Sequence, residues 1–350
     1  MLTIPEWWKT NLGYIDELAK NARRAEVKVL TPSAGGRPVY SFSYGEKQEI
    51  ESKANYNSAC GGWDLNAYAP VEGKKPVVIL LGGIHGGEVE AIAALGNLIT
   101  LLETGKDRKG ETNEEILKAV EKIRLVIVPV CNPDGRARLP HESVLGMTMQ
   151  EHRYWFQGAW KDGSLVGCPT CKLLHPMKEE LLSFMGTYFN DDGINLMHDN
   201  FFHPMAKETQ ALLDLADAEK ADFIMQLHGG SQCYNEIIKA RYVTLESQLT
   251  LHDLSVRCDL QAQKENLRFQ IAPIPPKEEG AVPPMFNLVC ALHHVCGAVS
   301  GLFESNQCVA GEPGVHLDHD QVYRSHMILF ENLFNLAYER KTIKYTFSTL

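Results

Sequence analysis

A short apolar run that ends in a glycine-rich turn and continues with helical periodicity sets the strongest limit on how this chain can fold. Residues 76–82 read Pro-Val-Val-Ile-Leu-Leu-Gly and predict a fully buried strand. Residues 88–103 place apolar side chains at helical spacing, so the glycines at 83, 86 and 87 predict a strand-to-helix loop. A buried strand followed by a helix is typical of α/β proteins with a parallel sheet.

The same turn carries two side chains that commonly bind metal ions. His85 and Glu88 lie three residues apart at the predicted carboxyl end of the strand. An imidazole and a carboxylate at this spacing can chelate one ion, and the neighbouring glycines let the backbone approach it. The chain contains 13 histidines, so the spacing alone is weak evidence and the position at a strand end carries the prediction.

The pattern from residue 76 onward predicts a mixed, mostly parallel twisted sheet with helices on both faces. The predicted strands are 76–82, 124–130, 222–227 and 297–304, and the predicted helices are 88–103, 113–121, 246–266 and 319–340.

The first 56 residues precede this alternation. Residues 5–27 predict an amphipathic helix, and the alternating segments 37–44 and 48–56 predict an antiparallel hairpin at the edge of the sheet. We therefore expect residues 1–30 to form a helical extension and residues 31–350 to form a single catalytic domain.

Composition narrows the possible partners. A chain of 350 residues with 44% hydrophobic residues is long enough for a deep core. A net charge of −10 without a Lys/Arg stripe argues against nucleic-acid binding, and no apolar run approaches a membrane span. We expect a cytoplasmic protein that binds neither nucleic acid nor membrane, acting on a peptide or small amide.

Nine cysteines, several in apolar surroundings, fit a reducing compartment, and the lone pair Cys168 and Cys171 is either structural or a metal or redox site.

Two more side chains complete a candidate hydrolytic site. His228 follows the predicted strand 222–227, and Glu304 ends the predicted strand 297–304. The carboxyl ends of parallel strands meet at one edge of a sheet, so these groups are expected to approach His85 and Glu88. Two imidazoles and one carboxylate suit a single zinc ion per chain, with Glu304 left as a general base.

The ordered set of motifs resembles the zinc carboxypeptidase (funnelin) family over residues 35–340. The motifs are His85-x-x-Glu88, Asn132-Pro-Asp-Gly135, Gly193-Ile-Asn-Leu, His228 and Phe303-Glu304, with Gly36-Arg-Pro-Val-Tyr40 resembling the early hairpin. The resemblance implies an eight-stranded mixed sheet between helices. It also implies that His85, Glu88 and His228 are zinc ligands and that Glu304 activates water for attack on an amide carbonyl.

The departures from the family concern the substrate. The Asn-Arg pair that grips a terminal carboxylate falls here on Met197 and His198, and the Asp of the same run is Asn195. An imidazole lacks the permanent charge and planar fork of a guanidinium, so ordinary removal of a C-terminal residue is in doubt. Substrate contacts are expected from Asn195, His198, Arg136 and Arg138. Of the arginines at 136, 138 and 153, Arg153 is the preferred candidate for stabilising the oxyanion.

Three functions remain open at this point. The first is a zinc-dependent metallopeptidase. The second is an N-acyl amino acid amidohydrolase of the succinylglutamate desuccinylase or aspartoacylase kind, whose second half would be a small β domain. The third is a non-catalytic zinc-binding relic, which the presence of Glu304 disfavours. Continued alternation of helix and strand over residues 206–340 favours the first.

Overall fold

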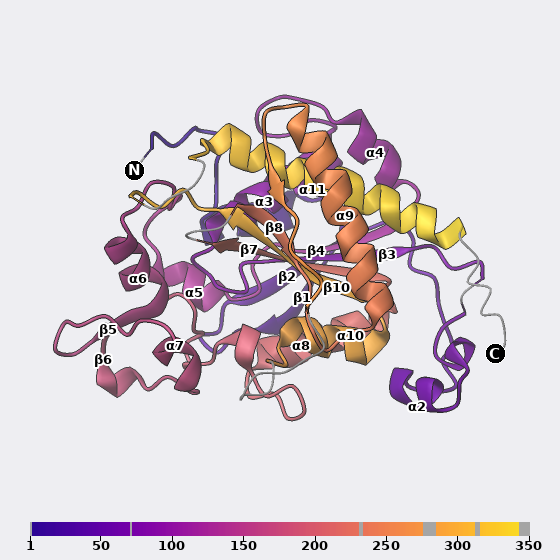
Figure 1. The fold of residues 1–350 in the computed structure, drawn as a ribbon, viewed down its shortest axis with the longest axis horizontal. Coiled ribbons are helices and arrows are strands. Elements are labelled where there is room, and N and C mark those ends of the chain that lie inside the picture. Colours follow the sequence, from indigo (N-terminus) through magenta and orange to yellow (C-terminus); the bar gives the residue numbers. More distant parts are fainter. Residues whose placement is uncertain (1, 71, 231–233, 276–284, 312–315, 343–350) are drawn as a thin grey trace.

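An eight-stranded mixed sheet forms the centre of the protein (Figure 1). The computed structural model describes residues 2–70, 72–230, 234–275, 285–311 and 316–342. The strand order is β1-β2-β4-β3-β7-β10-β8-β9. The strands span Glu26–Pro32 (β1), Pro38–Tyr44 (β2), Val77–Gly82 (β3), Arg124–Val128 (β4), Phe223–Gly230 (β7), Asn235–Ile238 (β8), Phe269–Gln270 (β9) and Val299–Asn306 (β10). Neighbours within β4-β3-β7-β10 pair parallel, which confirms the predicted mostly parallel sheet.

Helices cover both faces of this sheet because its central strands are apolar on both sides. Val78 and Leu80 of β3 pack into one core cluster, whereas Ile79 and Leu81 pack into the other. The first face is covered by α3 (Val89–Thr104), α4 (Glu114–Val120), α9 (Leu245–Gln263) and α11 (His319–Thr342), and the second by α8 (Lys207–Glu219) and α10 (Leu288–Cys296). Figure 1 shows α4 and α11 above the sheet and α8 and α10 below it.

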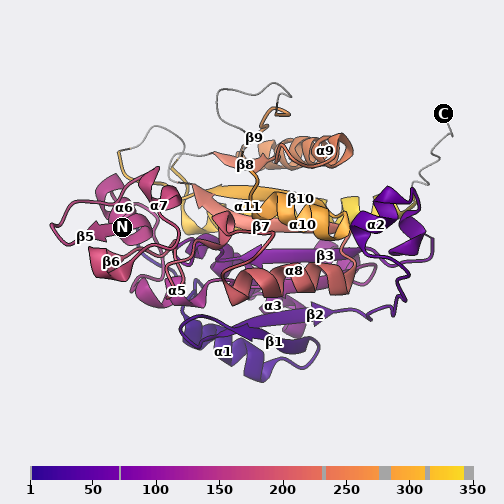
Figure 2. The ribbon, with the colours of Figure 1, turned by 90° about the horizontal axis from the view of Figure 1, so that it is seen from below.

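Short elements between β4 and α8 gather at one end of the sheet (Figure 2). They are α5 (Pro133–Arg138), α6 (Met149–Gln157), α7 (Thr170–Leu173), the 3-10 helices Glu179–Leu181 and Leu196–His198, and a hairpin of β5 (Gly158–Trp160) with β6 (Leu182–Met185). The remaining elements are α1 (Leu12–Asn21), α2 (Tyr56–Gly61) and the 3-10 helix Leu65–Ala67. Among the described residues, no helix combines the length and apolarity needed to cross a membrane.

The amino-terminal part differs from the sequence-based prediction. The hairpin joins β1 to β2, whereas residues 48–55 form no strand, so the pairing of 37–44 with 48–56 was wrong. The segment 48–56 carries mostly polar side chains, while β1 alternates Val27 and Val29 with polar residues and can pair with β2. The predicted helix 5–27 is also shorter, since α1 ends at Asn21. The expected boundary after residue 30 therefore falls inside β1.

Asp134 ties the loop between β1 and β2 to the site end of the sheet. Its buried carboxylate accepts hydrogen bonds from Ser33 Oγ (2.5 Å), Gly35 N (2.9 Å), Arg37 Nη1 (2.8 Å) and Asp191 N (3.1 Å). Burial alone would raise the pKa of Asp134, but these donors outweigh it and hold the pKa below the ordinary value of 3.8.

We predict that Asp134→Asn lowers the free energy of unfolding by about 2–3 kcal/mol, because the amide replaces a charged acceptor and turns its own N–H groups toward donors. Urea denaturation measures the loss, with the neighbouring exposed Asp192→Asn as the control.

The native carboxylate is stabilising above the unfolded pKa, and this contribution disappears as pH falls through the lower native pKa. The gap between wild type and Asp134→Asn should therefore be full near neutral pH and shrink below 3.8. A gap that does not depend on pH would contradict this assignment.

Candidate metal centre

Three strands of the sheet deliver the predicted site residues to one edge. The loop after β3 carries His85 and Glu88, β7 carries His228 near its carboxyl end, and β10 carries Glu304 at the matching position. In the parallel ladder of β7 with β10, His228 pairs in register with Glu304. Directly opposed residues on parallel strands point to the same face, so the two side chains are neighbours.

His85, Glu88 and His228 form a compact group of potential metal ligands. His85 Nδ1 lies 2.7 Å from Glu88 Oε1, and His228 Nδ1 lies 2.8 Å from Glu88 Oε2. One ligand atom from each residue falls within 4.8 Å of the others, and all three residues are buried. Burial would raise the pKa of Glu88, but the imidazoles of His85 and His228 outweigh it and lower the pKa to about 2. The Glu88 side chain is therefore an anion at neutral pH.

The contacts of Glu88 suit a cation better than a hydrogen-bonded network. Although His228 Nδ1 is 2.8 Å from Glu88 Oε2, the pair lacks hydrogen-bond geometry, and this buried oxygen has no hydrogen-bond partner. An anionic oxygen buried in this way is costly unless an ion or donor satisfies it. Two imidazole nitrogens and one carboxylate, with a fourth position open, are the donor set of catalytic zinc sites. The residues present therefore fit zinc.

Neighbouring side chains orient the two imidazoles. The Nε2 atom of His85 lies 3.2 Å from Asn195 Oδ1, and the ring of Tyr188 stacks on His85 at 4.1 Å between centroids. The Nε2 atom of His228 lies 3.4 Å from Gln226 Oε1. A proton on Nε2 in each ring leaves Nδ1 free as a ligand atom. Asn195 is 1% exposed and its carbonyl oxygen faces His85, an arrangement that suits orienting this imidazole, while its expected contact with substrate stays a prediction.

The glycines of the loop are required by close packing. A Cβ atom on Gly86 would lie 2.1 Å from the backbone nitrogen of Arg136, and one on Gly87 would lie 2.3 Å from Thr187 Oγ1. No side chain fits at either position without displacing the segment it meets. The backbone around His85 is thereby wedged between α5 and the segment after β6.

Glu304 is a buried carboxyl group beside the three potential ligands. Its Oε2 atom has no hydrogen-bond partner. Burial raises the pKa of Glu304 to about 7; the neighbouring Glu88 and Glu236 add to the rise, whereas His228 and Lys172 oppose it. A carboxyl group whose pKa lies near neutrality can take up a proton and release it.

His198 and Lys172 stand near the same group of side chains. Burial is the largest cause that lowers the pKa of His198 to about 3, and the nearby His85 adds to it, so His198 is a neutral imidazole. Lys172 is exposed on α7, and its charge acts on both His198 and Glu304. Sequence reasoning missed Lys172, because a single lysine in an irregular segment belongs to no recognisable pattern.

The three arginines expected to contact substrate or oxyanion differ in their burial and in their hydrogen-bond partners. The buried guanidinium of Arg136 donates to Thr10 O and Oγ1, Leu139 O and His141 O, and that of Arg138 donates to Asp191, Gly186 O and Phe189 O. Both groups hold loops together through these bonds, and their expected role in substrate binding stays a prediction. Arg153 lies on the exposed side of α6, whereas His152 and Phe156 of that helix are buried. The expected role of Arg153 in stabilising an oxyanion stays a prediction.

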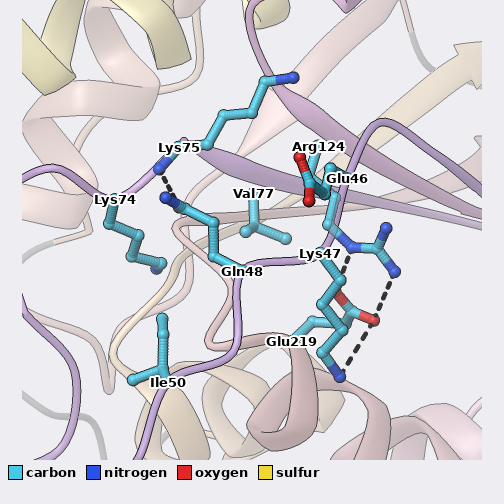
Figure 3. A pocket seen from close by; sticks show the side chains of 9 residues that line it. All are labelled: Glu46, Lys47, Gln48, Ile50, Lys74, Lys75, Val77, Arg124 and Glu219. Carbon is cyan, nitrogen blue, oxygen red and sulfur yellow. Dashed lines mark hydrogen bonds and ion pairs between the residues drawn. The ribbon is translucent and has the colours of Figure 1, made fainter.

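Two other features lie outside the metal centre. Figure 3 shows a pocket in which Lys47 and Arg124 flank Glu219. Its lining includes Val77 and Arg124, the first residues of β3 and β4, so it lies at the opposite edge of the sheet from His85.

Cys168 and Cys171 are free thiols, and neither joins a metal-binding group among the residues that the structure describes.

Comparisons with known proteins agree with this fold. A family model described as zinc carboxypeptidase matches residues 12–254. No curated protein matches the chain.

Three solved structures share the fold at low sequence identity. The metallo-carboxypeptidase from Burkholderia cenocepacia has a TM-score of 0.56 at 15% identity, with 93% of this chain and 68% of that chain covered. The metallo-carboxypeptidase from Pseudomonas aeruginosa in complex with (2-guanidinoethylmercapto)succinic acid has a TM-score of 0.54 at 13% identity, with 93% and 67% covered. Carboxypeptidase A from Helicoverpa armigera has a TM-score of 0.50 at 13% identity, with 94% and 71% covered.

We predict that the wild-type protein binds one zinc ion per chain and that His228→Ala weakens zinc binding by more than about 100-fold, because one of three protein ligands is lost. Chelator competition and metal analysis measure the affinity and the stoichiometry. His203→Ala, which removes an exposed imidazole outside the group, serves as the control. Tight, stoichiometric zinc binding by His228→Ala would show that the ion is held elsewhere.

Proposed function

The chain belongs to the zinc carboxypeptidase family, and on that basis we propose that it hydrolyses an amide bond of a peptide or peptide-like substrate with Glu304 as the general base. The family supports a zinc-dependent metallopeptidase. The observation that carries the proposal is a buried carboxyl group, Glu304, in register beside His228 and with one oxygen free of hydrogen bonds. We also propose that residues from β1 onward form one catalytic domain that holds one zinc ion.

His85, Glu88 and His228 would hold the zinc through two Nδ1 atoms and one carboxylate. When bound, zinc would polarise the scissile carbonyl group and make a water molecule more acidic. The side chains of Asn195 and Gln226 hold the Nε2 atoms of the two imidazoles, which would leave both Nδ1 atoms, beside Glu88, available to bind zinc.

Glu304 would move the proton in this reaction. Its carboxylate accepts a proton from the attacking water and then donates it to the nitrogen of the leaving amine. A pKa of about 7 suits both steps, since the group is a base before the attack and an acid after it. Burial keeps bulk water from competing for that proton.

The two positions expected to bind the end of the substrate carry Met197 and His198, so neither offers a guanidinium. Met197 is buried and apolar, and His198 is a neutral imidazole with a pKa of about 3. Lys172 brings an exposed positive charge whose field reaches Glu304. We assign to Lys172 the attraction of a negatively charged group on the substrate.

The alternative hydrolase is less well supported. An amidohydrolase of the succinylglutamate desuccinylase or aspartoacylase kind would end in a small β domain. Here α8, α9, α10 and α11 continue to alternate with strands of the same sheet. The relic hypothesis requires the loss of a base, whereas Glu304 is present next to His228.

We predict that Glu304→Gln lowers kcat for amide hydrolysis by at least about 1,000-fold, because the amide cannot accept the proton of water. Zinc affinity should stay close to that of wild type. Profiling against dipeptides, amidated peptides, γ-glutamyl peptides and N-acyl amino acids identifies the substrate on which to measure it. Glu331→Gln, which alters a buried carboxylate paired with Arg324 on α11, is the control for stability effects. Full hydrolysis by Glu304→Gln would exclude Glu304 as the base.

We predict that kcat/KM rises with pH up to about neutrality as Glu304 loses its proton. We call this rise of kcat/KM with pH the acid limb of the pH profile. Two variants should shift its midpoint in opposite directions. Lys172→Ala removes a positive charge that lowers the pKa of Glu304, so the limb should shift to higher pH. Glu236→Gln removes a negative charge that raises this pKa, so the limb should shift to lower pH. Equal shifts of the same sign in both variants would mean that another group controls the limb.

A further inference from the structure

A buried polar chain lies next to the metal centre and is not used by the proposed chemistry. The side-chain amide of Gln307 is its middle member. Its Nε2 atom donates to Glu90 Oε2 at 3.2 Å, and its Oε1 atom accepts from His152 Nε2 at 2.8 Å. All three residues are buried: Gln307 is 0% exposed, Glu90 is 1% exposed and His152 is 5% exposed. An amide that is buried and bonded at both ends has one stable orientation.

Gln307 touches the segments that carry the metal ligands. Glu90 lies in the first turn of α3, two residues after Glu88. A Cβ atom on Gly229, the residue after His228, would lie 2.5 Å from Gln307 Nε2, so the amide lies directly against that backbone. The backbone nitrogen of Gln307 also donates to Gly230 O at 3.2 Å.

The same residue is joined to the strand of the base. Gln307 follows β10 directly and stands three residues after Glu304. Three segments far apart in the sequence, those of Glu88, His228 and Glu304, are therefore linked by one side chain. In the described part of the chain, no other side chain bonds to Glu90, whose Oε1 atom has no hydrogen-bond partner.

We infer that Gln307 is a positioning residue that sets the spacing of the metal ligands by bonding to Glu90 and His152 while it packs on Gly229. This inference rests on the proposed metal site. Without the amide, Glu90 and His152 would lose their shared partner, and the cost of leaving two buried polar groups unpaired would favour a shift of α3 or α6. The ligands do not move independently of α3 and β7, so such a shift changes the site itself.

The test compares zinc affinity and ligand geometry in Gln307→Leu and wild type. We expect zinc to bind about 10–100-fold more weakly in Gln307→Leu, as for other groups that orient metal ligands. The visible spectrum of the Co²⁺-substituted protein, which reports coordination geometry, should change as well. Gln248→Leu is the matched control, because it removes another buried amide, one that donates to Ala240 O. Gln248→Leu should leave both readouts unchanged.

A swapped pair separates positioning from a general loss of stability. Gln307→Glu alone sets two carboxyl groups against each other, whereas Glu90→Gln combined with Gln307→Glu again places one amide beside one carboxyl group. The double variant should recover zinc affinity toward the wild-type value, and the single variant should not. If Gln307→Leu fails to fold, Gln307→Asn replaces it, since the shorter amide cannot reach both partners.

The outcomes are distinct. Wild-type zinc affinity and an unchanged Co²⁺ spectrum in folded Gln307→Leu or Gln307→Asn would overturn the inference and leave the proposed function intact. A double variant as weak as Gln307→Glu would also overturn it. If wild-type protein binds no zinc, the proposed function fails and the inference falls with it.

Discussion

The in-register pairing of β7 with β10 is the constraint on which the site depends. It places His228 beside Glu304, and a slip of one residue would turn Glu304 to the opposite face of the sheet. The register is fixed by burial on both faces of β10. Phe303 stacks on Phe269 at 5.6 Å between ring centroids in one core cluster, and Leu302 packs into the other. A slipped strand would have to bury Glu304 in the place of Phe303, which the apolar cores do not accept.

The site concentrates groups that are unfavourable for folding. The buried carboxyl groups of Glu88, Glu90 and Glu304 each have one oxygen without a hydrogen-bond partner. Arrangements of this kind persist only where the surrounding structure enforces them. Here a large apolar core on both faces of the sheet and the wedged loop around Gly86 supply that enforcement. Two of these groups, Glu88 and Glu304, are those that a cation and a proton transfer would use, so part of the destabilising arrangement coincides with the proposed chemistry.

Sequence reasoning located the central sheet and the metal group because both leave local patterns. The apolar run before His85 and the one before His228 predict strands, and strand ends in a parallel sheet converge. The first hairpin was assigned to the wrong partner, since alternation over a few residues does not specify which strand pairs with which. The roles of Arg136 and Asn195 were also beyond the sequence. Arg136 is occupied by Thr10 and by carbonyl groups at 139 and 141, and such contacts arise only when distant segments meet.

The charges around Glu304 limit what kind of substrate recognition is possible. His198 was expected to contact the end of the substrate, and its pKa of about 3 leaves it uncharged at neutral pH. Lys172 is a positive side chain whose charge acts on Glu304, as does the imidazole of His228. An ammonium group on a flexible stem attracts negative charge without fixing its plane, whereas a guanidinium binds both oxygens of a carboxylate in one geometry. If Lys172 attracts the substrate as proposed, the site would select the sign of the substrate's charge more strongly than the shape of its end. Such a site would tolerate a modified or displaced carboxylate.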